Sequence, residues 1–385
     1  MRVVHVNSDA GRTGGASIAV CRLHKMFSDM GVDSIIVCRH QPMEPGSVLV
    51  HRGIVWSFLL FCWRVFMKIY AGTCYPTGLI STGLARRINK YKPDLVILHW
   101  LQNDTMSVEE IMRLKAPVLW FHHDLWPVLG LMSYPYFAVP RRSLFVDRMS
   151  RWNKRRVMRR MGVNMTPICA SDWCASEIVK YGHYLRNPRI VPLPVDSCFT
   201  HGPRRRHEKF RILSGAFGGF QMGIKGGDRL LEALKMISDD EWCDMEVVVF
   251  GAGDGEKKFD GITIRFIGRL TGDKLAQEYR DADVFAFPSR QETFGQTKFE
   301  ALSCGTPVVV FDESACSAGV IHLVNGWVAS ADDIAGFAAG LNYYHAAWRQ
   351  GRPIRVSPSP DYSPEIVAQK WMDLLKSLCN NVESI

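Results

Sequence analysis

The chain has 385 residues, of which 47% are apolar and 22% charged, so it is long enough for two folded domains and its composition excludes a disordered protein. Its formal net charge of +9 favours anionic partners, such as nucleic acid, phosphorylated substrates or an acidic membrane surface. Eleven cysteines lie between Cys21 and Cys379 without a C-x-x-C pair. This spacing argues against a disulfide framework and a structural zinc site, and for a reducing compartment.

The N-terminal stretch Met1–Gly15 is strand-like and then rich in glycine, so it does not predict a signal peptide. The most apolar run, Gly53–Trp63, is too short to span a bilayer and ends at Arg64. We therefore expect a cytoplasmic protein, one that can still rest on a membrane.

The first half of the chain alternates predicted strands with helices. A short buried strand at Arg2–Val6 is followed by a glycine-rich turn and by an amphipathic helix whose apolar residues recur as far as Met30. Three further runs are typical of buried parallel strands: Ser34–Cys38, Asp94–His99 and Pro117–His122. This alternation predicts a doubly wound α/β domain.

A proline-containing and basic stretch, Val191–Phe210, interrupts the pattern and marks a domain boundary. The alternation then resumes, with a helix at Asp228–Ile237 and strands expected at Arg211–Phe217, Glu246–Gly251, Ile264–Gly268, Val284–Pro288 and Pro307–Phe311. We therefore expect an α/β protein of two Rossmann-like doubly wound domains, residues 1–198 and 199–362, facing across a cleft. Residues 363–385 add a terminal helix, with Ser363 as its cap and Pro364 in its first position, that can cross back to the first domain.

Two glutamates stand out in the segment Ser289–Phe311. Glu292 lies in the loop after a predicted strand, whereas Glu300 lies inside the following helix, which we expect to end near Gly305. The rise of a helix separates the two carboxylates by roughly 10 Å or more, which is too far for the carboxylate pair of a retaining glycosidase. Lys298, between them, is predicted to be a solvated helix residue.

The start of this helix, Phe294–Thr297, suits a phosphate because its backbone N–H groups and dipole favour an anion. Carboxylates beside a phosphate are explained if they accept hydrogen bonds from sugar or ribose hydroxyls. The alternative, that Glu292 and Glu300 are solvated residues at a helix start, stays open from spacing alone.

At these residues the sequence resembles the family-4 retaining glycosyltransferases, which have the GT-B architecture. The hallmark E-x7-E, between a strand ending in P-S and a helix followed by G-x-P-V-V, is present here in these residues: Pro288-Ser289, Glu292, Phe294-Gly295, Glu300-Ala301, Gly305-Thr306-Pro307-Val308-Val309 and Asn325-Gly326. The resemblance also covers the N-terminal glycine loop and the terminal helix, so it extends over most of the chain.

The resemblance implies a role for each matching residue. Glu292 would bind hydroxyls of the donor sugar near the reacting face, and Glu300 would bind the ribose. Amides of the helix start would hold sugar hydroxyls and the distal phosphate: Thr293, Phe294, Gly295, Gln296 and Thr297. Gly268 would let the nucleotide base approach the backbone, with Arg269 and Leu270 beside it.

Lys225 matches the family lysine that neutralises the donor diphosphate. The family usually has an arginine about six residues earlier, where this chain has Gly219. Either another basic residue substitutes or the diphosphate binds more weakly.

Two further site candidates lie in the first half. The loop Gly11–Ser17 fits neither G-x-G-x-x-G nor a Walker A motif, and its plain interpretation is a tight turn; the resemblance implies that Gly14 and Gly15 line the cleft near the donor phosphate. His123, in the H-D-x-W-P segment, would contact the donor sugar near the reacting carbon. The alternative for His123 is a strand-end histidine satisfied by the backbone.

We expect no metal. The H-E-x-x-H spacing is absent around His123. Asp281 and Asp283 match the D-x-D metal motif of the other major glycosyltransferase fold, but they directly precede a predicted strand, and we interpret Asp283 as structural.

The segment Arg141–Arg160 has nine basic residues against one acid, Asp147, with apolar residues interleaved. A basic amphipathic helix of this kind is typical of a contact with a membrane surface or a polyanion; the alternative is a solvated helix face. Nucleic acid is a rival partner, but no nucleic-acid motif accompanies the patch. With the apolar stretch Trp56–Tyr70, the segment favours anionic lipid.

The sequence therefore predicts a retaining transferase of polysaccharide biosynthesis, peripheral on the inner face of the membrane. It would use a nucleotide-diphosphate sugar as co-substrate, with no cofactor, and the leaving phosphate would act as the base. The acceptor would be a lipid-linked oligosaccharide or a growing polysaccharide. The alternatives are a nucleotide-sugar epimerase on the same fold and a non-catalytic membrane- or polyanion-binding protein. UDP, GDP and ADP donors are not distinguished by the sequence.

Overall fold

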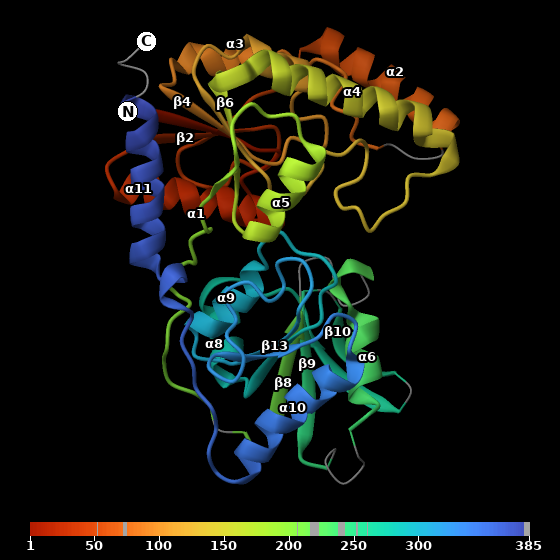
Figure 1. The fold of residues 1–385 in the computed structure, drawn as a ribbon, viewed down its shortest axis with the longest axis vertical. Helices are drawn as coiled ribbons and strands as arrows, with labels where there is room; N and C mark the ends of the chain where they lie inside the picture. The colour runs from red at the N-terminus through yellow and green to blue at the C-terminus, as the bar shows by residue number, and fades with distance from the viewer. Residues whose placement is uncertain are drawn as a thin grey trace. The chain divides into compact units, whose positions relative to one another are not determined.

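The structure, a computed structural model, describes residues 1–51, 53–71, 75–205, 207–215, 223–237, 243–251, 253–259 and 261–380. The chain divides into two compact units, Met1–Leu193 and Pro194–Ile385, and each unit is built on its own sheet (Figure 1).

The first unit has a parallel sheet of seven strands in the order β3-β2-β1-β4-β5-β6-β7. The strands are β1 (Arg2–Val6), β2 (Asp33–Cys38), β3 (Ser47–Leu49), β4 (Leu95–Leu98), β5 (Val118–Phe121), β6 (Met165–Cys169) and β7 (Arg189–Ile190). The α-helices are α1 (Gly15–Asp29), α2 (Ile54–Ala71), α3 (Leu84–Ile88), α4 (Leu144–Met161) and α5 (Asp172–Tyr181). Short 3₁₀ turns complete the unit: η1 (Asn89–Tyr91), η2 (Val108–Arg113), η3 (Arg141–Ser143) and η4 (Gly162–Asn164).

The second unit has seven strands in the order β10-β11-β9-β8-β12-β13-β14, parallel except for the antiparallel pair of β10 with β11. The strands are β8 (Phe210–Gly215), β9 (Met245–Phe250), β10 (Asp254–Phe259), β11 (Ile262–Ile267), β12 (Val284–Phe287), β13 (Val308–Phe311) and β14 (Gly326–Ala329). The helices are η5 (Gly223–Lys225), α6 (Gly227–Leu234), α8 (Gly272–Asp281), α9 (Gln296–Ser303), α10 (Ile334–Arg349), η6 (Pro360–Tyr362) and α11 (Pro364–Asn380).

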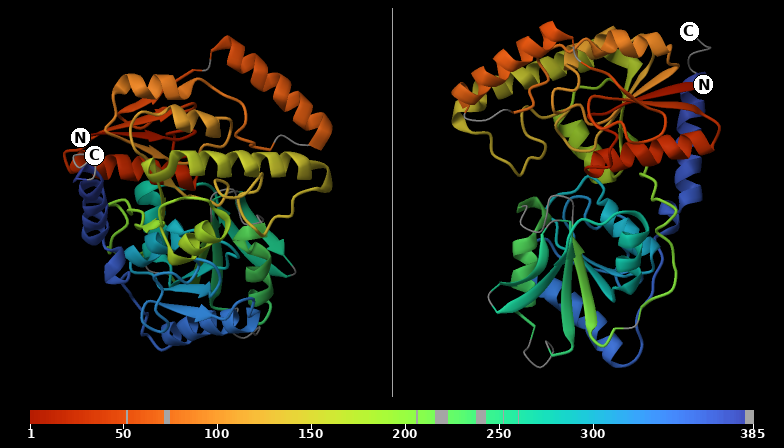
Figure 2. Two further views of the ribbon diagram at one scale, coloured as in Figure 1. Left: turned by 45° about the horizontal axis from the view of Figure 1, so that its top comes forward. Right: turned by 180° about the vertical axis from the view of Figure 1, so that it is seen from behind.

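Each sheet has helices on both faces, as Figures 1 and 2 show from opposite sides. In the first unit α1 and α5 cover one face, and α3, η2 and α4 the other. In the second unit α6 and α10 cover one face, and α8 and α9 the other. The central strands are buried on both faces, which explains why they consist of apolar residues throughout.

The expected architecture of two doubly wound domains is confirmed. Each strand expected from the sequence is present, and its described ends lie within two residues of the expected ones. The expected end at Phe217 lies outside the described residues. The terminal helix begins at Pro364 as predicted, and the Ser363 hydroxyl accepts a hydrogen bond from the Ile366 N–H (3.4 Å). The sequence pattern did not predict β3, β6, β7, β10 or β14. In β6 the reason is Pro167, a residue that weakens the signal of a central strand.

Candidate active site

Residues 288–295, which include Glu292 and which we call the motif loop, join the carboxyl end of β12 to α9. Gly295 caps α9 with φ of 79°, and a Cβ on this residue would lie 2.9 Å from the ring of Phe287, so the turn needs glycine. Phe294 is buried and stacks on Phe299, with 4.4 Å between ring centroids. Gln296 and Thr297 stay partly exposed at the helix start. The loop therefore lies where ligands bind in open α/β sheets.

Glu292 is the charged centre of this loop. Its Oε1 accepts hydrogen bonds from the ammonium of Lys225 (2.5 Å) and from the hydroxyl of Ser289 (3.1 Å). Its backbone is held by the loop after β13, because the Glu292 N–H donates to Ser314 Oγ (3.0 Å) and the Ala315 N–H donates to the Glu292 carbonyl (3.2 Å). The residue is only 7% exposed, and these contacts hold it from several sides.

Lys225 reaches Glu292 from a different segment, the turn between β8 and α6. This turn is pressed against the motif loop at Gly226, where φ is 68° and a Cβ would lie 2.0 Å from the carbonyl oxygen of Pro288. Arg290, in the motif loop, links it to the segment of Lys225. Its guanidinium donates to the Gly223 carbonyl (2.7 Å) and to the carboxylate of Asp228. The two predicted catalytic residues of the second unit are thus brought into direct contact.

Glu300 has a separate partner. It lies in α9, is 4% exposed, and accepts a hydrogen bond from the hydroxyl of Tyr279 in α8 (3.1 Å). The interpretation of Glu300 as a solvated residue is therefore wrong, and so is that of Glu292. Their roles toward ribose and sugar hydroxyls stay predictions.

Lys298 corrects a prediction from the sequence. Instead of being solvated, it is fully buried in α9, and its ammonium donates to the carbonyls of Ala315 (2.5 Å) and Cys316 (2.9 Å). Burial lowers the pKa of Lys298 from 10.5 to about 7. The lysine points inward because it ties α9 to the loop after β13, the same loop that holds the backbone of Glu292.

Gly268 follows the carboxyl end of β11 with φ of 68°. Its carbonyl accepts a hydrogen bond from the Gly251 N–H (2.8 Å), and a Cβ at Gly268 would meet only Gly253 O, at 3.8 Å. Space is therefore open beside this backbone, and Arg269 and Leu270 continue the loop at the same edge of the sheet. A base-binding role for the three residues stays a prediction.

In the first unit the glycine loop follows β1. Gly14 is the N-cap of α1, which begins at Gly15. The loop is pinned by Asp9, whose Oδ1 accepts hydrogen bonds from the Gly11 N–H (3.2 Å) and from the hydroxyls of Thr13 (2.9 Å) and Ser17 (2.5 Å). Sequence reasoning missed Asp9, although an Asp near the end of a strand and before a glycine turn is a usable signal.

His123 follows the carboxyl end of β5, and its Nε2 is hydrogen-bonded to Nδ1 of His99 (2.8 Å). The neighbouring Asp124 fixes the loop, because its carboxylate accepts from Trp100 Nε1 (3.1 Å), Gln102 Nε2 (2.6 Å) and the Trp126 N–H (2.9 Å). Burial raises the pKa of Asp124. His123 is therefore part of a hydrogen-bonded side-chain network as well as a strand-end histidine.

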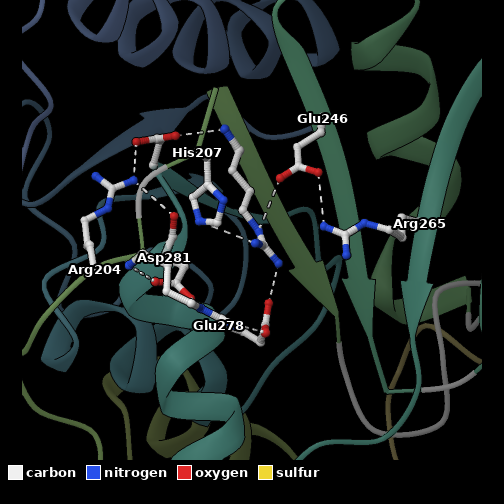
Figure 3. Close-up of polar contacts among 9 residues, drawn as sticks. Arg204, His207, Glu246, Arg265, Glu278 and Asp281 are labelled. Atoms are coloured by element: carbon white, nitrogen blue, oxygen red, sulfur yellow. Dashed lines mark hydrogen bonds and ion pairs between the residues drawn. The ribbon is translucent and has the colours of Figure 1, made fainter. Parts of the chain in front are cut away.

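The D-x-D residues are bound by arginines (Figure 3). Asp281 accepts from the backbone N–H (2.7 Å) and the Nε (2.6 Å) of Arg205. Asp283 accepts from Arg204 (2.5 Å) and from the Arg211 N–H (2.8 Å). Both carboxylates are buried. These contacts confirm the structural interpretation of Asp283, because the pair anchors the segment that leads into β8.

The basic segment Arg141–Arg160 forms η3 and α4 as predicted. Lys154 is an exception to the expected basic face: it is buried, and its ammonium donates to the carbonyls of Trp126 (2.6 Å), Leu129 (3.1 Å) and Gly130 (2.6 Å). Lys154 thus holds together the backbone of residues 126–130, in and after the H-D-x-W-P segment.

Gly219, the position where the family usually has an arginine, lies outside the described residues.

Two family models match the chain: "Glycosyltransferase Family 4" over residues 13–197 and "Glycosyl transferases group 1" over residues 212–346. The chain is 33% identical over 339 residues to the GDP-mannose-dependent alpha-(1-6)-phosphatidylinositol dimannoside mannosyltransferase of Mycobacterium tuberculosis, a match covering 82% of this chain and 80% of that protein. It is 29% identical over 299 residues to the sulfoquinovosyl transferase SQD2 of Arabidopsis thaliana, covering 74% of this chain but only about half, 54%, of that relative.

Solved structures agree in fold. Anabaena HepE in complex with UDP-glucose matches with a TM-score of 0.65 at 13% identity over all of both chains. Sucrose-phosphate synthase from Thermosynechococcus elongatus matches with a TM-score of 0.66 at 16% identity over 99% of this chain and 100% of that one. With two Rossmann-like units and these relatives, the chain belongs to the family-4, group 1 glycosyltransferases and is an enzyme of the GT-B fold.

Proposed function

We propose that the protein transfers a sugar from a nucleotide-diphosphate sugar to an acceptor hydroxyl with retention of the anomeric configuration. The observation that carries the proposal is the contact between Glu292 and Lys225, 2.5 Å apart at the carboxyl edge of the second sheet. A carboxylate for sugar hydroxyls and an ammonium for the diphosphate are the two groups such a donor needs side by side.

In the proposed reaction, the acceptor oxygen forms its bond to the anomeric carbon on the face from which the diphosphate leaves. The bond between that carbon and the phosphate oxygen breaks, and the departing phosphate takes the acceptor proton. Lys225 stabilises the charge that grows on the leaving group. Glu292 orients the sugar and Glu300 accepts from the ribose. The family resemblance assigns His123 a contact with the same sugar.

We infer that this chemistry needs no metal. The carboxylates of Asp281 and Asp283 already accept hydrogen bonds from arginines. Turnover should therefore be unchanged after dialysis against a chelator. A requirement for added Mg²⁺ or Mn²⁺ would refute the inference.

For the donor, we propose a UDP- or GDP-sugar. A relative is named as GDP-mannose-dependent, and a structural neighbour is described with UDP-glucose. A thermal-shift screen of UDP-, GDP- and ADP-sugars tests this, because a ligand that binds only the folded state raises the melting temperature.

We further propose that the enzyme docks on an anionic membrane through α2 and α4, which is where a lipid-linked acceptor would be reached. Among the described residues, no helix combines the length and apolar character that crossing a bilayer requires. Instead, α2 exposes a continuous set of large apolar side chains: Ile54, Val55, Phe58, Leu59, Phe61, Val65, Phe66, Ile69 and Tyr70. An exposed apolar set of this size is typical of an interaction surface.

Helix α4 supplies the charge and two further apolar anchors. Phe145 is 68% and Trp152 63% exposed, and they share the helix with exposed arginines: Arg148, Arg159 and Arg160. The two helices meet through a small cluster in which Met67 of α2 packs with Val146 of α4. Burial, and then the positive charges of Arg151 and Arg159, lower the pKa of Arg155. Apolar anchors beside cations suit an anionic lipid surface.

Two experiments test the proposal. Radiolabelled donor is incubated with enzyme, with and without a lipid-linked acceptor. Transfer supports the proposed function, an isomer formed from donor alone indicates an epimerase, and no reaction indicates a non-catalytic protein.

Glu292→Ala should reduce transfer by at least about 100-fold and leave the melting curve intact. The control Glu232→Ala, at an exposed position of α6, should behave as wild type. Near-normal turnover of Glu292→Ala would refute the assignment.

The membrane arm uses co-sedimentation with vesicles. The double variant F145S/W152S should bind phosphatidylglycerol-containing vesicles at least about tenfold more weakly, because each large apolar side chain contributes about 1.5–3 kcal/mol when buried. Val179→Ser, on the opposite helix layer and 65% exposed, is the control. Equal binding of all proteins, or binding to purely zwitterionic vesicles, would contradict the proposed surface.

A further inference from the structure

Three histidines form a continuous hydrogen-bonded chain across neighbouring strands of the first unit. His5 lies within β1, His99 follows β4 and His123 follows β5, and these strands are adjacent in the sheet. Nδ1 of His5 lies 3.0 Å from Nε2 of His99, and Nδ1 of His99 lies 2.8 Å from Nε2 of His123. The chain therefore ends at the histidine that we assign to the donor sugar.

The two inner rings are buried, whereas His123 is partly exposed. Loss of hydration lowers the pKa of His5 to about 3 and that of His123 to about 3, and it lowers the pKa of His99 well below its usual value. All three rings are therefore neutral near pH 7. A neutral imidazole carries one N–H donor and one bare acceptor nitrogen.

Neutral rings allow only two arrangements of the three protons. In the first, His5 donates to His99 and His99 donates to His123, so His123 carries its own proton on Nδ1. In the second, both bonds run the other way, and the remaining proton lies on Nε2 of His5. Each arrangement leaves one end of the chain protonated and the other bare.

The inner end of the chain decides between them. Nε2 of His5 is buried and has no hydrogen-bond partner in the part of the chain that the structure describes. Its ring lies against Phe27, 5.3 Å away between centroids. Because a buried N–H without an acceptor is rare in native proteins, the bare nitrogen belongs at this end and the proton at the other.

We propose that His5 and His99 are positioning residues that fix His123 in the tautomer protonated on Nδ1. As a consequence, Nδ1 of His123 is an N–H donor, a group suited to an oxygen of the donor sugar. It cannot accept a proton from the acceptor hydroxyl. The consequence for catalysis rests on the proposed function, whereas the tautomer itself does not.

The direct test is nitrogen NMR of enzyme labelled with ¹⁵N-histidine, with signals assigned from single histidine variants. Nδ1 of His123 should be protonated and its Nε2 bare, in enzyme without substrate. A proton on Nε2 of His123 would overturn the proposal. Because this readout needs no turnover, it decides the matter even if the transferase activity is never found.

Variants at His99 test the positioning role. Asparagine places an amide N–H where Nδ1 of His99 lies, so His99→Asn should keep the tautomer of His123 and stay within about threefold of wild-type kcat. His99→Leu removes the donor, so the Nδ1 preference should be lost and kcat should fall about tenfold or more, with the donor KM little changed.

The matched control is His122→Leu. His122 is equally buried and adjacent to His123, but it is hydrogen-bonded to the hydroxyl of Tyr184 (2.9 Å) and lies outside the chain. This variant should leave the His123 signals unchanged. If His99→Leu keeps the Nδ1 tautomer, or if asparagine and leucine at 99 behave alike, then His99 does not position His123.

Discussion

Lys298→Met tests the idea that a buried lysine holds the active-site loop. In the wild type, the ammonium of Lys298 donates to the carbonyls of Ala315 and Cys316 and lies 4.9 Å from the ring centroid of Phe299. Methionine keeps most of the side-chain volume but removes both hydrogen bonds. The loop that it releases is the one whose Ala315 N–H donates to the Glu292 carbonyl.

Two large terms oppose each other in this variant. Each buried carbonyl left without a donor costs about 1–3 kcal/mol. The opposing effect favours the variant, because methionine carries no charge that must be buried. In the wild type, burial of the ammonium is unfavourable enough to lower the pKa of Lys298 from 10.5 to about 7. Near neutral pH these terms largely cancel, so the pH dependence of stability is the more telling quantity.

The sign follows from proton linkage. Between pH 7 and 10.5 the unfolded chain keeps the Lys298 proton while the folded protein loses it, so this residue makes the wild type more stable as the pH rises. The slope is up to about 1.4 kcal/mol per pH unit. Below pH 7 both states are protonated, and the contribution is constant.

Urea unfolding at pH 7.0 and at pH 9.5, followed by tryptophan fluorescence, measures this difference. The free energy of unfolding of wild type relative to Lys298→Met should rise by about 2–3 kcal/mol between the two pH values. The exposed Lys274, on α8, gives the control Lys274→Met, which should show no such rise. Parallel pH profiles for wild type and Lys298→Met would refute the reasoning.

The remaining predictions concern both units. Gly226→Ala should lower kcat about tenfold or more, because its Cβ would strike the Pro288 carbonyl and displace the neighbouring Lys225; steady-state kinetics checks this, and unchanged turnover would contradict it. Lys154→Met should destabilise the protein by about 1–3 kcal/mol, because three buried carbonyls of the loop 126–130 lose their donor, and the relief of no longer burying an ammonium offsets this only in part, since Asp124 and Asp147 already favour the charge. Thermal unfolding measures this loss, and a melting temperature equal to that of wild type would contradict it.

Much of the fold was predictable because buried parallel strands are encoded locally. The runs at Asp94–His99 and Pro117–His122 are apolar and β-branched, so their type could be inferred without knowing their neighbours. β10 could not be predicted in the same way: it is an exposed strand, Asp254–Phe259, that pairs antiparallel with β11, and its polar residues carry little strand signal.

The candidate site was predictable only in part. The sequence pattern placed Glu292 in the loop after a strand and Glu300 in the following helix. It did not give their partners, because Lys225 is 67 residues from Glu292 and Tyr279 is 21 residues from Glu300 in sequence. Lys298 was assigned to solvent because lysine is rarely buried. Its location inside the protein depends on two carbonyls that the loop after β13 brings to it.

By itself, then, the sequence determined the class of fold and the family, because hydrophobic runs and the E-x7-E segment are local properties of the chain. The tertiary structure alone decided which polar groups meet. His5, His99 and His123 come from three strands that are adjacent only in the folded sheet, and their pairing spans 94 and 24 residues. Burial is a property of long-range packing, so the state of a buried histidine or lysine is set by neighbours that the linear pattern does not contain.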